Sequence, residues 1–528
     1  MARVRFVGPA LILASATAFA LGAGSASAQQ FSCPKKGGEF IFGQEAKVNS
    51  LDSHASAAIS TRNIAMNIYE ALMTRDENFN PMLDLASSVD TSPDGKTHVF
   101  KLRQGVRFHS GKPMTSADVV ASYNRYKKIG IERGMLDVVE KWEAPDAGTF
   151  VLRMKVAQPT FLENMSSFLV PIVIIPAEHA ENPAMQLAPI GTGPFQHVEF
   201  VPDSHVRLKR FDGYAPNAAY KDIDGFGGYK VACVDSVTFR IVTEPGARVA
   251  GIETGELHAV EDVPAKSQET LKKNKSVVLK EWKNFWIQLV EVNAGFPPTD
   301  NLKFRQAAMA ALNMDEIMES ASDGAYRLNI GLQYPGQAAY TEAGKETYNQ
   351  KNPAKAKQLL AEAGYKGEEM ILLTNKDYTS MYNASLVVAE QLKAVGINAR
   401  LQVMDWPAAA QMFEKSNTGW NWFFDAFGNN PVIGPISSVR KFSAPQNAYK
   451  PKTPDDVDKP FNEAFNDMVN GATPEIRKAA FARAQARLLE QGYVVPFGSL
   501  TKIQAVRSNV ENYRPYRIPR ISNVYFSG

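Results

Sequence analysis

A carboxylate among aromatic residues is the feature of this sequence best suited to binding a charged ligand. Asp425 stands in a run of aromatic residues between Gly419 and Gly428. A carboxylate in apolar surroundings is costly unless it is paired or hydrogen-bonded. A ligand ammonium group would pair it, and the rings would add cation–π attraction. The pattern predicts a ligand-binding wall, and the alternative for each single ring is packing in a hydrophobic core. The candidate ligand-binding rings are Trp420, Trp422, Phe424 and Phe427.

Sequence signatures of catalysis are incomplete or missing. The segment 105–112 resembles a phosphate-binding loop, but it has five residues between its glycines and is followed by Pro113, whereas that loop needs four residues and then Ser or Thr. The glycines of 191–193 lack the third glycine of a dinucleotide-binding turn. No G-x-S-x-G or H-E-x-x-H motif occurs. We therefore predict that the protein is not an enzyme and holds no cofactor or metal; a hydrolase is the alternative.

The composition is that of a folded, nearly neutral protein. The chain has 528 residues, of which 45% are hydrophobic and 21% charged, so we expect two to four domains. The formal net charge is +3 and no basic run occurs, which gives no support for nucleic-acid binding. Beyond the N-terminal segment, no apolar stretch of about 18 residues is present, so we expect a soluble mature chain.

Residues 1–28 have the pattern of a secretory signal peptide. Arg3 and Arg5 precede an apolar stretch, and Ala26 and Ala28 provide a small-residue cleavage site. We predict cleavage after Ala28 and localisation in the periplasm. The alternative is a retained membrane anchor.

The chain has two cysteines, Cys33 and Cys233. An even pair in an exported chain suggests a disulfide bond. The alternatives are two reduced thiols, or lipid attachment at Cys33. The preceding residues 30–32 lack the small and leucine residues that a lipid-attachment site usually needs.

The second half of the chain shows an α/β pattern. A helix begins at Pro353 after a capping asparagine and ends at Gly364. A strand at 370–373, a helix through 386–395 and a strand at 397–403 follow. This order predicts a parallel strand pair with a right-handed crossover. Ligand sites in such sheets lie beyond the carboxyl ends of the strands.

The first half mixes short strands and helices. We expect strands at 40–42, 97–103, 106–108 and 150–154, a helix at 64–72, and a helix after Thr115 that carries Asp118 in its first turn.

The order of several short motifs resembles a known protein family. The motifs are Ser50 to His54, Asn67 to Leu72, Pro93 to Thr97, Phe100 to Gly111, Pro189 to Phe195, Asn293 with Pro297 and Pro298, Arg305 to Ala307, and Ala356 to Tyr365. In this order and spacing, together with the signal peptide, they resemble the extracellular solute-binding proteins of the peptide, dipeptide and nickel class (family 5) of bacterial ABC importers. The resemblance runs from about residue 38 to about residue 510.

The resemblance implies an α/β, two-lobed, periplasmic-binding-protein-like fold with mixed sheets, an extra subdomain in the first lobe and a hinged cleft. After the signal peptide, the expected divisions are 29–77, 189–290 and 495–528 for lobe I, 78–188 for the extra subdomain, and 291–494 for lobe II. The segment 100–111 would then be structural.

The resemblance also implies site residues. In peptide-binding members an Asp in a Trp-x-x-Asp context holds the ligand's amino group, and Trp422 with Asp425 has that spacing. A proline usually follows soon after, whereas here Pro431 comes six positions later. The other candidates are Ala57, Ala58 and Ile59, which match the first-lobe segment that meets the ligand backbone, Asp377 and Tyr378 in a second-lobe segment, and Arg440 for a ligand carboxylate.

The function implied is that of a monomeric periplasmic receptor. It would capture a small peptide or peptide-like ligand by domain closure and deliver it to the permease subunits of an ABC transporter in the inner membrane. The alternatives are the same role for a non-peptide ligand (an amino-acid conjugate or opine, an oligosaccharide or a chelated metal), a periplasmic hydrolase, and a secreted chaperone or adhesin.

Overall fold

The computed structural model describes residues 29–56, 58–261, 263–376, 378–404, 406–428, 433–444, 446–453 and 456–528. The predicted signal peptide, the candidate residues Ala57 and Asp377, and Pro431 lie outside the described residues.

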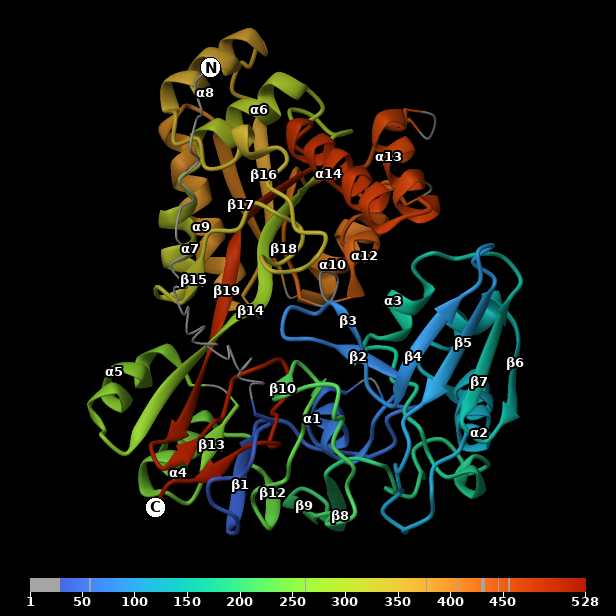
Figure 1. The fold of residues 1–528 in the computed structure, drawn as a ribbon. Helices are drawn as coiled ribbons and strands as arrows, with labels where there is room; N and C mark the ends of the chain where they lie inside the picture. Colours follow the sequence, from blue (N-terminus) through green and yellow to red (C-terminus); the bar gives the residue numbers. More distant parts are fainter. Residues whose placement is uncertain are drawn as a thin grey trace, which may run out of the picture.

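Two long antiparallel strands connect the two lobes. β14 (Val277–Val292) pairs with β19 (Val494–Arg507), and the pair runs from the lower lobe into the upper lobe (Figure 1). The register of the pair shifts between Trp282 and Trp286, where the strands pass from one lobe to the other. One hydrogen-bonded sheet of 11 strands therefore extends through both lobes. Its strand order is β17 (Asn398–Met404), β16 (Glu369–Asn375), β18 (Trp422–Phe427), β14, β19, β13 (Ala259–Val260), β1 (Glu39–Gln44), β12 (Ser236–Ile241), β9 (His205–Arg210) and β8 (Phe195–Val201), with β15 (Tyr326–Arg327) paired to β19.

We use lobe I for the lower part in Figure 1, which holds both ends of the described chain. Its strands are β1 (Glu39–Gln44), β8 (Phe195–Val201), β9 (His205–Arg210), β12 (Ser236–Ile241) and β13 (Ala259–Val260), and its helices include α1 (Ile59–Ile68), α4 (Pro245–Thr254) and α5 (Ala265–Lys273). β1 is parallel to both of its neighbours, β12 and β13. β9 is antiparallel to β12, so this part of the sheet is mixed, as expected.

Lobe II is the upper part in Figure 1. Its strands are β15 (Tyr326–Arg327), β16 (Glu369–Asn375), β17 (Asn398–Met404) and β18 (Trp422–Phe427), and its helices are α6 (Leu302–Ala311), α7 (Met314–Ser322), α8 (Pro353–Glu362), α9 (Thr379–Ala394), α10 (Trp406–Lys415), α12 (Pro435–Val439), α13 (Lys459–Asn470) and α14 (Pro474–Glu490). The predicted parallel pair is confirmed as β16 and β17, joined by α9. Asn352 caps α8, because its side chain accepts a hydrogen bond from the Lys355 N–H.

A separate four-stranded antiparallel sheet lies beside lobe I, at the right of Figure 1. Its strands are β4 (Ala86–Thr91), β5 (Thr97–Leu102), β7 (Thr149–Met154) and β6 (Val139–Asp146), and α2 (Ser116–Ile129) packs against it. Tyr123 of α2 lies 4.8 Å from the ring of Phe150, in a hydrophobic core of its own. The predicted helix after Thr115 is α2, which carries Asp118 in its first turn as expected, and Thr115 and Asp118 form a capping box at its start.

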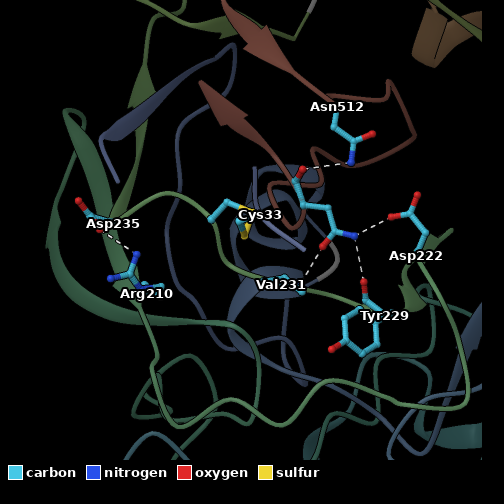
Figure 2. Close-up of a disulfide and its surroundings, with 9 residues drawn as sticks. Cys33, Arg210, Asp222, Tyr229, Val231, Asp235 and Asn512 are labelled. Carbon is cyan, nitrogen blue, oxygen red and sulfur yellow. Dashed lines mark hydrogen bonds and ion pairs between the residues drawn. A yellow bond between two sulfur atoms is a disulfide. The ribbon is translucent and has the colours of Figure 1, made fainter. Parts of the chain in front are cut away.

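The predicted disulfide bond between Cys33 and Cys233 is present. It ties the start of the described chain to the segment before β12 (Figure 2). Close by, the side chain of Asn523 accepts a hydrogen bond from the Val231 N–H and donates one to Asp222, at 2.7 Å each. The N-terminal, middle and C-terminal segments of the chain are thus joined in lobe I.

Three predicted elements differ from the structure. Residues 106–108 form no strand: the backbone turns there, with an isolated bridge between Arg107 and Pro113. The helix expected at 64–72 is α1, which begins earlier and ends at Ile68, because Tyr69 is extended. The helix expected at 386–395 is α9, which begins at Thr379.

None of the helices in the described ranges is long and apolar enough to cross a membrane. Within the same ranges, no group of three or more His, Cys, Asp or Glu side chains is placed to hold a metal ion.

Candidate ligand-binding site

Asp425 lies on β18, where it faces a lysine of the same chain. β18 pairs with β14 so that Asp425 stands opposite Leu289, on the same face of the sheet as Glu291. The Nζ of Lys441 lies 3.3 Å from one carboxylate oxygen of Asp425 and also contacts Glu291. The other oxygen of Asp425 accepts a hydrogen bond of 2.7 Å from the Ala426 N–H. The sequence predicts that Asp425 pairs with an ammonium group of a ligand. In the structure, the ammonium group of Lys441 forms this pair instead.

The three charged groups form a cluster of two acids and one base. Burial raises the pKa of the fully buried Glu291 to about 8, although the Lys441 ammonium acts in the opposite direction. Burial lowers the pKa of Lys441, but the two carboxylates outweigh it and the net shift is upward. Near neutral pH the cluster therefore holds a charged lysine, a protonated Glu291 and the Asp425 carboxylate. One carboxyl oxygen of Glu291 has no hydrogen-bond partner among the described residues.

The aromatic residues around Asp425 are packed in hydrophobic cores. Trp422 and Phe424 are fully buried in a core beneath α7 and α9, and Trp420 lies 5.5 Å from the ring of Phe413. Phe427 is also buried, but the Lys441 ammonium lies 4.3 Å from its ring centre. This is the core packing stated above as the alternative. The contact of these four rings with a ligand stays a prediction.

The other described candidates lie at different places. Tyr378 stands at the carboxyl end of β16 and meets Trp286 edge-on at 5.7 Å. Ala58 and Ile59 are exposed at the start of α1. Arg440 is exposed, and its guanidinium lies over the ring of Phe465 at 5.9 Å, whereas its neighbour Lys441 faces Asp425.

Both lobes meet where β14 and β19 cross between them, and we call this region the inter-lobe junction. It comprises Trp282, Phe285 and Trp286 of β14, Gly428 after β18, Lys502 of β19 and Arg517 of the C-terminal segment. Arg517 donates a hydrogen bond of 3.1 Å to the Phe285 carbonyl, and Lys502 lies 5.3 Å from the Phe285 ring. Tyr378 lies next to this region, because its ring packs edge-on against that of Trp286.

Residues that the sequence analysis missed thus occupy the junction. Arg517 lies 90 positions after the aromatic run and Lys502 lies 75 after it. No local pattern marks either residue, because the long strand β19 carries the chain back between the lobes. Lys441 was also missed, because the neighbouring Arg440 carries the same charge and the sequence does not show which of the two side chains faces Asp425.

A cavity of about 540 Å³ separates lobe II from the part of the chain around residues 73–163. On one side lie the hairpin of β2 (Met73–Arg75) and β3 (Pro81–Leu83) and the helix α3 (Phe161–Met165); on the other lie α12 and the start of α14. Arg75 donates a hydrogen bond of 3.0 Å to the Ile433 carbonyl, and the Ala338 N–H donates one of 2.8 Å to Asn80. Direct contacts therefore link the two sides of this cavity.

A family model of bacterial extracellular solute-binding proteins, family 5, matches residues 80–449. The match covers more than half of the chain. The chain belongs to this family. Family membership confirms the resemblance seen in the motifs, and the two-lobed α/β architecture described above agrees with it.

The family members most similar to the chain include two proteins named for peptides. The chain is 29% identical over 391 residues to a probable peptide ABC transporter periplasmic-binding protein, y4tO, of Sinorhizobium fredii, and this match covers 70% of the chain and 72% of the relative. It is 28% identical over 429 residues to the oligopeptide-binding protein AppA of Bacillus subtilis, and this match covers 74% of the chain and 73% of the relative. Among solved structures, the ABC transporter substrate-binding protein CtaP of Listeria monocytogenes superimposes with a TM-score of 0.78 at 21% identity, over 94% of this chain and all of that one. This likeness shows the fold.

Proposed function

We propose that this protein is a periplasmic receptor of an ABC importer that captures a small peptide or peptide-like ligand between its lobes and delivers it to the membrane permease. It carries out no bond chemistry. Membership of a family of solute-binding proteins supports the receptor role, and the names of the two relatives support a peptide ligand. The proposal includes export by the signal peptide and cleavage after Ala28.

The observation that carries the mechanism is the passage of β14 and β19 between the lobes. The lobes are connected by strands at the register shift between Trp282 and Trp286. Small backbone rotations there would move one lobe against the other, and a ligand that contacts both would stabilise the closed form. We propose the lobe limits 29–77, 189–290 and 495–528 for lobe I, 78–188 for the extra subdomain and 291–494 for lobe II; the parts of β14 and β19 that pair with β18 and β15 extend the upper lobe a few residues beyond these limits.

A thermal-unfolding screen of the mature protein tests this function. Panels of di-, tri- and oligopeptides, amino-acid conjugates, sugars and nickel would each be added in excess. A ligand at roughly 1,000 times its Kd stabilises the folded state by about 4 kcal/mol, which moves the Tm by several degrees. We expect the shift with peptides. A shift only with sugars or nickel would contradict the peptide part of the proposal.

Asp425 is the residue we propose for the ligand's amino group. Binding of that group would require Lys441 to move from Asp425 towards Glu291, which it already contacts. Asp425→Ala should weaken a peptide with a free amino group by roughly 2–5 kcal/mol if the ion pair is buried. Calorimetric titration with a peptide and with its N-acetylated form measures this loss.

The paired state of Asp425 also favours a second candidate within the receptor class. Because Lys441 already neutralises the carboxylate, a ligand without a free amino group, such as an amino-acid conjugate, could bind without displacing it. Equal affinity for the free and the N-acetylated peptide in the wild-type protein would support this second candidate and remove Asp425 from the site.

A further inference from the structure

Arg62 is a buried cation with no counter-charge among the described residues. It lies on α1, one turn after the loop expected to meet the ligand, and it is only 8% exposed. No described residue accepts a hydrogen bond from its guanidinium group or forms an ion pair with it, and its Nε is buried without a partner. Its guanidinium carbon lies 5.6 Å from the ring centre of Phe168. A buried charge of this kind destabilises the folded protein unless an opposite charge pairs with it.

Two described acidic residues near α1, Glu45 and Glu261, are engaged elsewhere. Glu45 contacts Lys502 at 3.4 Å and Arg248 at 3.6 Å. Glu261 accepts hydrogen bonds from the Glu45 N–H at 3.2 Å and from Asn63 at 3.3 Å. Neither carboxylate forms an ion pair or hydrogen bond with Arg62. An acceptor for Arg62 must therefore be a group other than Glu45 and Glu261.

A second guanidinium group, that of Arg517, is linked to the first through aromatic rings: Phe168 packs on Phe226 at 4.9 Å, and Phe226 packs on Tyr516, the neighbour of Arg517, at 4.8 Å. Burial and then the charge of Arg517 lower the pKa of Arg62 to about 10, so both groups remain charged at neutral pH. Arg517 is held by the Phe285 carbonyl at 3.1 Å and lies over Trp282 at 5.6 Å. Two like charges in a half-buried place repel each other, and an anion bound to both would remove the repulsion.

Arg517 lies in the inter-lobe junction, and Phe168, the ring that Arg62 covers, shares a hydrophobic core with Trp282 of the junction. A Cβ built on Gly428 would lie 3.5 Å from one terminal nitrogen of Arg517, so this guanidinium reaches the end of β18 in lobe II. Two further buried N–H donors, Trp286 Nε1 and Arg327 Nε, have no acceptor among the described residues. Trp286 is part of the junction itself, and Arg327 lies beside it, since Trp286 and Tyr326 both pair with Leu500 of β19. Among the described residues, Trp286 Nε1 and Arg327 Nε thus join Arg62 Nε as buried N–H donors without an acceptor in or beside the junction.

We infer that Arg62 and Arg517 form an anion-binding pair on lobe I that holds a carboxylate of the ligand in the inter-lobe junction. This inference rests on the proposed receptor function and narrows its ligand to a peptide or peptide-like molecule with a free carboxylate. Guanidinium groups suit this task because their parallel N–H donors match the two oxygens of a carboxylate.

A comparison of free and amidated peptides tests the pair. A set of tripeptides, each as the free acid and as the C-terminal amide, would be titrated into the mature protein by calorimetry. We expect the wild-type protein to prefer the acid about tenfold or more, and Arg62→Met and Arg517→Met to lose most of that preference while amide binding changes little. Arg240→Met is the matched control, since Arg240 is an exposed arginine of lobe I that pairs with Glu256, and it should leave the preference unchanged.

The stability of the ligand-free variant gives a second, independent measurement. Replacing an unpaired buried charge by an apolar side chain of similar size is neutral or stabilising. Arg62→Met should therefore keep or raise the Tm of the ligand-free protein. A fall of several degrees would overturn the inference, because it would mean that Arg62 is already paired.

The outcomes separate the inference from the proposed function. Equal binding of acid and amide by the wild-type protein would overturn the carboxylate pair and leave the peptide receptor standing. If the wild-type protein binds neither the acid nor the amide, the peptide part of the proposed function is contradicted. The Tm of Arg62→Met would then test whether Arg62 is unpaired, as the anion-binding pair requires.

Discussion

At the scale of single residues, the cluster of Asp425, Lys441 and Glu291 shows why charge in a site has to be counted as a whole. A carboxylate beside aromatic rings suggested an ammonium ligand, and the structure supplies the ammonium from Lys441. Because burial keeps Glu291 protonated, the cluster is neutral without any ligand. A ligand amino group would have to replace Lys441 or bind when Glu291 loses its proton.

The stability of the protein should depend on pH through Glu291. The pKa of Glu291 is about 8 in the folded protein, against an ordinary value of 4.5. Between these values the folded state holds a proton that the unfolded state releases, so stability falls as pH rises from 4.5 to 8. The free energy of unfolding of the wild type, relative to Glu291→Gln, should fall by up to about 1.4 kcal/mol per pH unit in this window.

Urea unfolding of both proteins at several pH values measures this difference. Glu390→Gln, at an exposed position on α9, is the control and should give a constant difference from the wild type. A constant difference for Glu291→Gln as well would show that Glu291 is ionised in the folded protein at neutral pH.

At the scale of elements, three of the family motifs contact one another. The His109 N–H donates a hydrogen bond of 3.0 Å to the Gly191 carbonyl, and the Gly193 N–H donates one of 2.9 Å to the Ile68 carbonyl at the end of α1. The segments 100–111 and 189–195 thus hold α1 in place. The expected strand at 106–108 is instead one side of a tight loop: the Phe108 N–H donates to the Lys112 carbonyl at 2.9 Å, and the Met114 N–H donates to the Val106 carbonyl at 3.0 Å.

The glycine at 191 is required by this close approach. A Cβ at Gly191 would lie 2.2 Å from the Ile68 carbonyl oxygen, so Gly191→Ala should destabilise the protein by about 2–3 kcal/mol through overpacking. Gly246→Ala is the control: no atom lies within 4 Å of a Cβ built in this first turn of α4. The control should be neutral or up to about 1 kcal/mol more stable. Chemical denaturation compares the two, and equal stabilities would contradict the close packing.

At the scale of the whole molecule, the sequence predicts the fold far better than the site. Local patterns such as the helix start after Thr115, with Asp118 in its first turn, and the strand–helix–strand order around α9 depend on neighbouring residues, and the structure confirms them. The inter-lobe junction joins Phe285, Gly428 and Arg517, which no short segment contains. Their meeting depends on the path of β14 and β19 between the lobes, so only the three-dimensional structure brings them together.

Small-angle X-ray scattering tests the central claim, capture of a ligand by closure of the lobes. The mature protein would be stripped of bound ligand and measured alone and with the peptide that gives the largest thermal shift. A receptor that closes around its ligand should show a smaller radius of gyration when saturated, at one peptide per chain. A saturated protein whose radius of gyration equals that of the ligand-free protein would contradict closure.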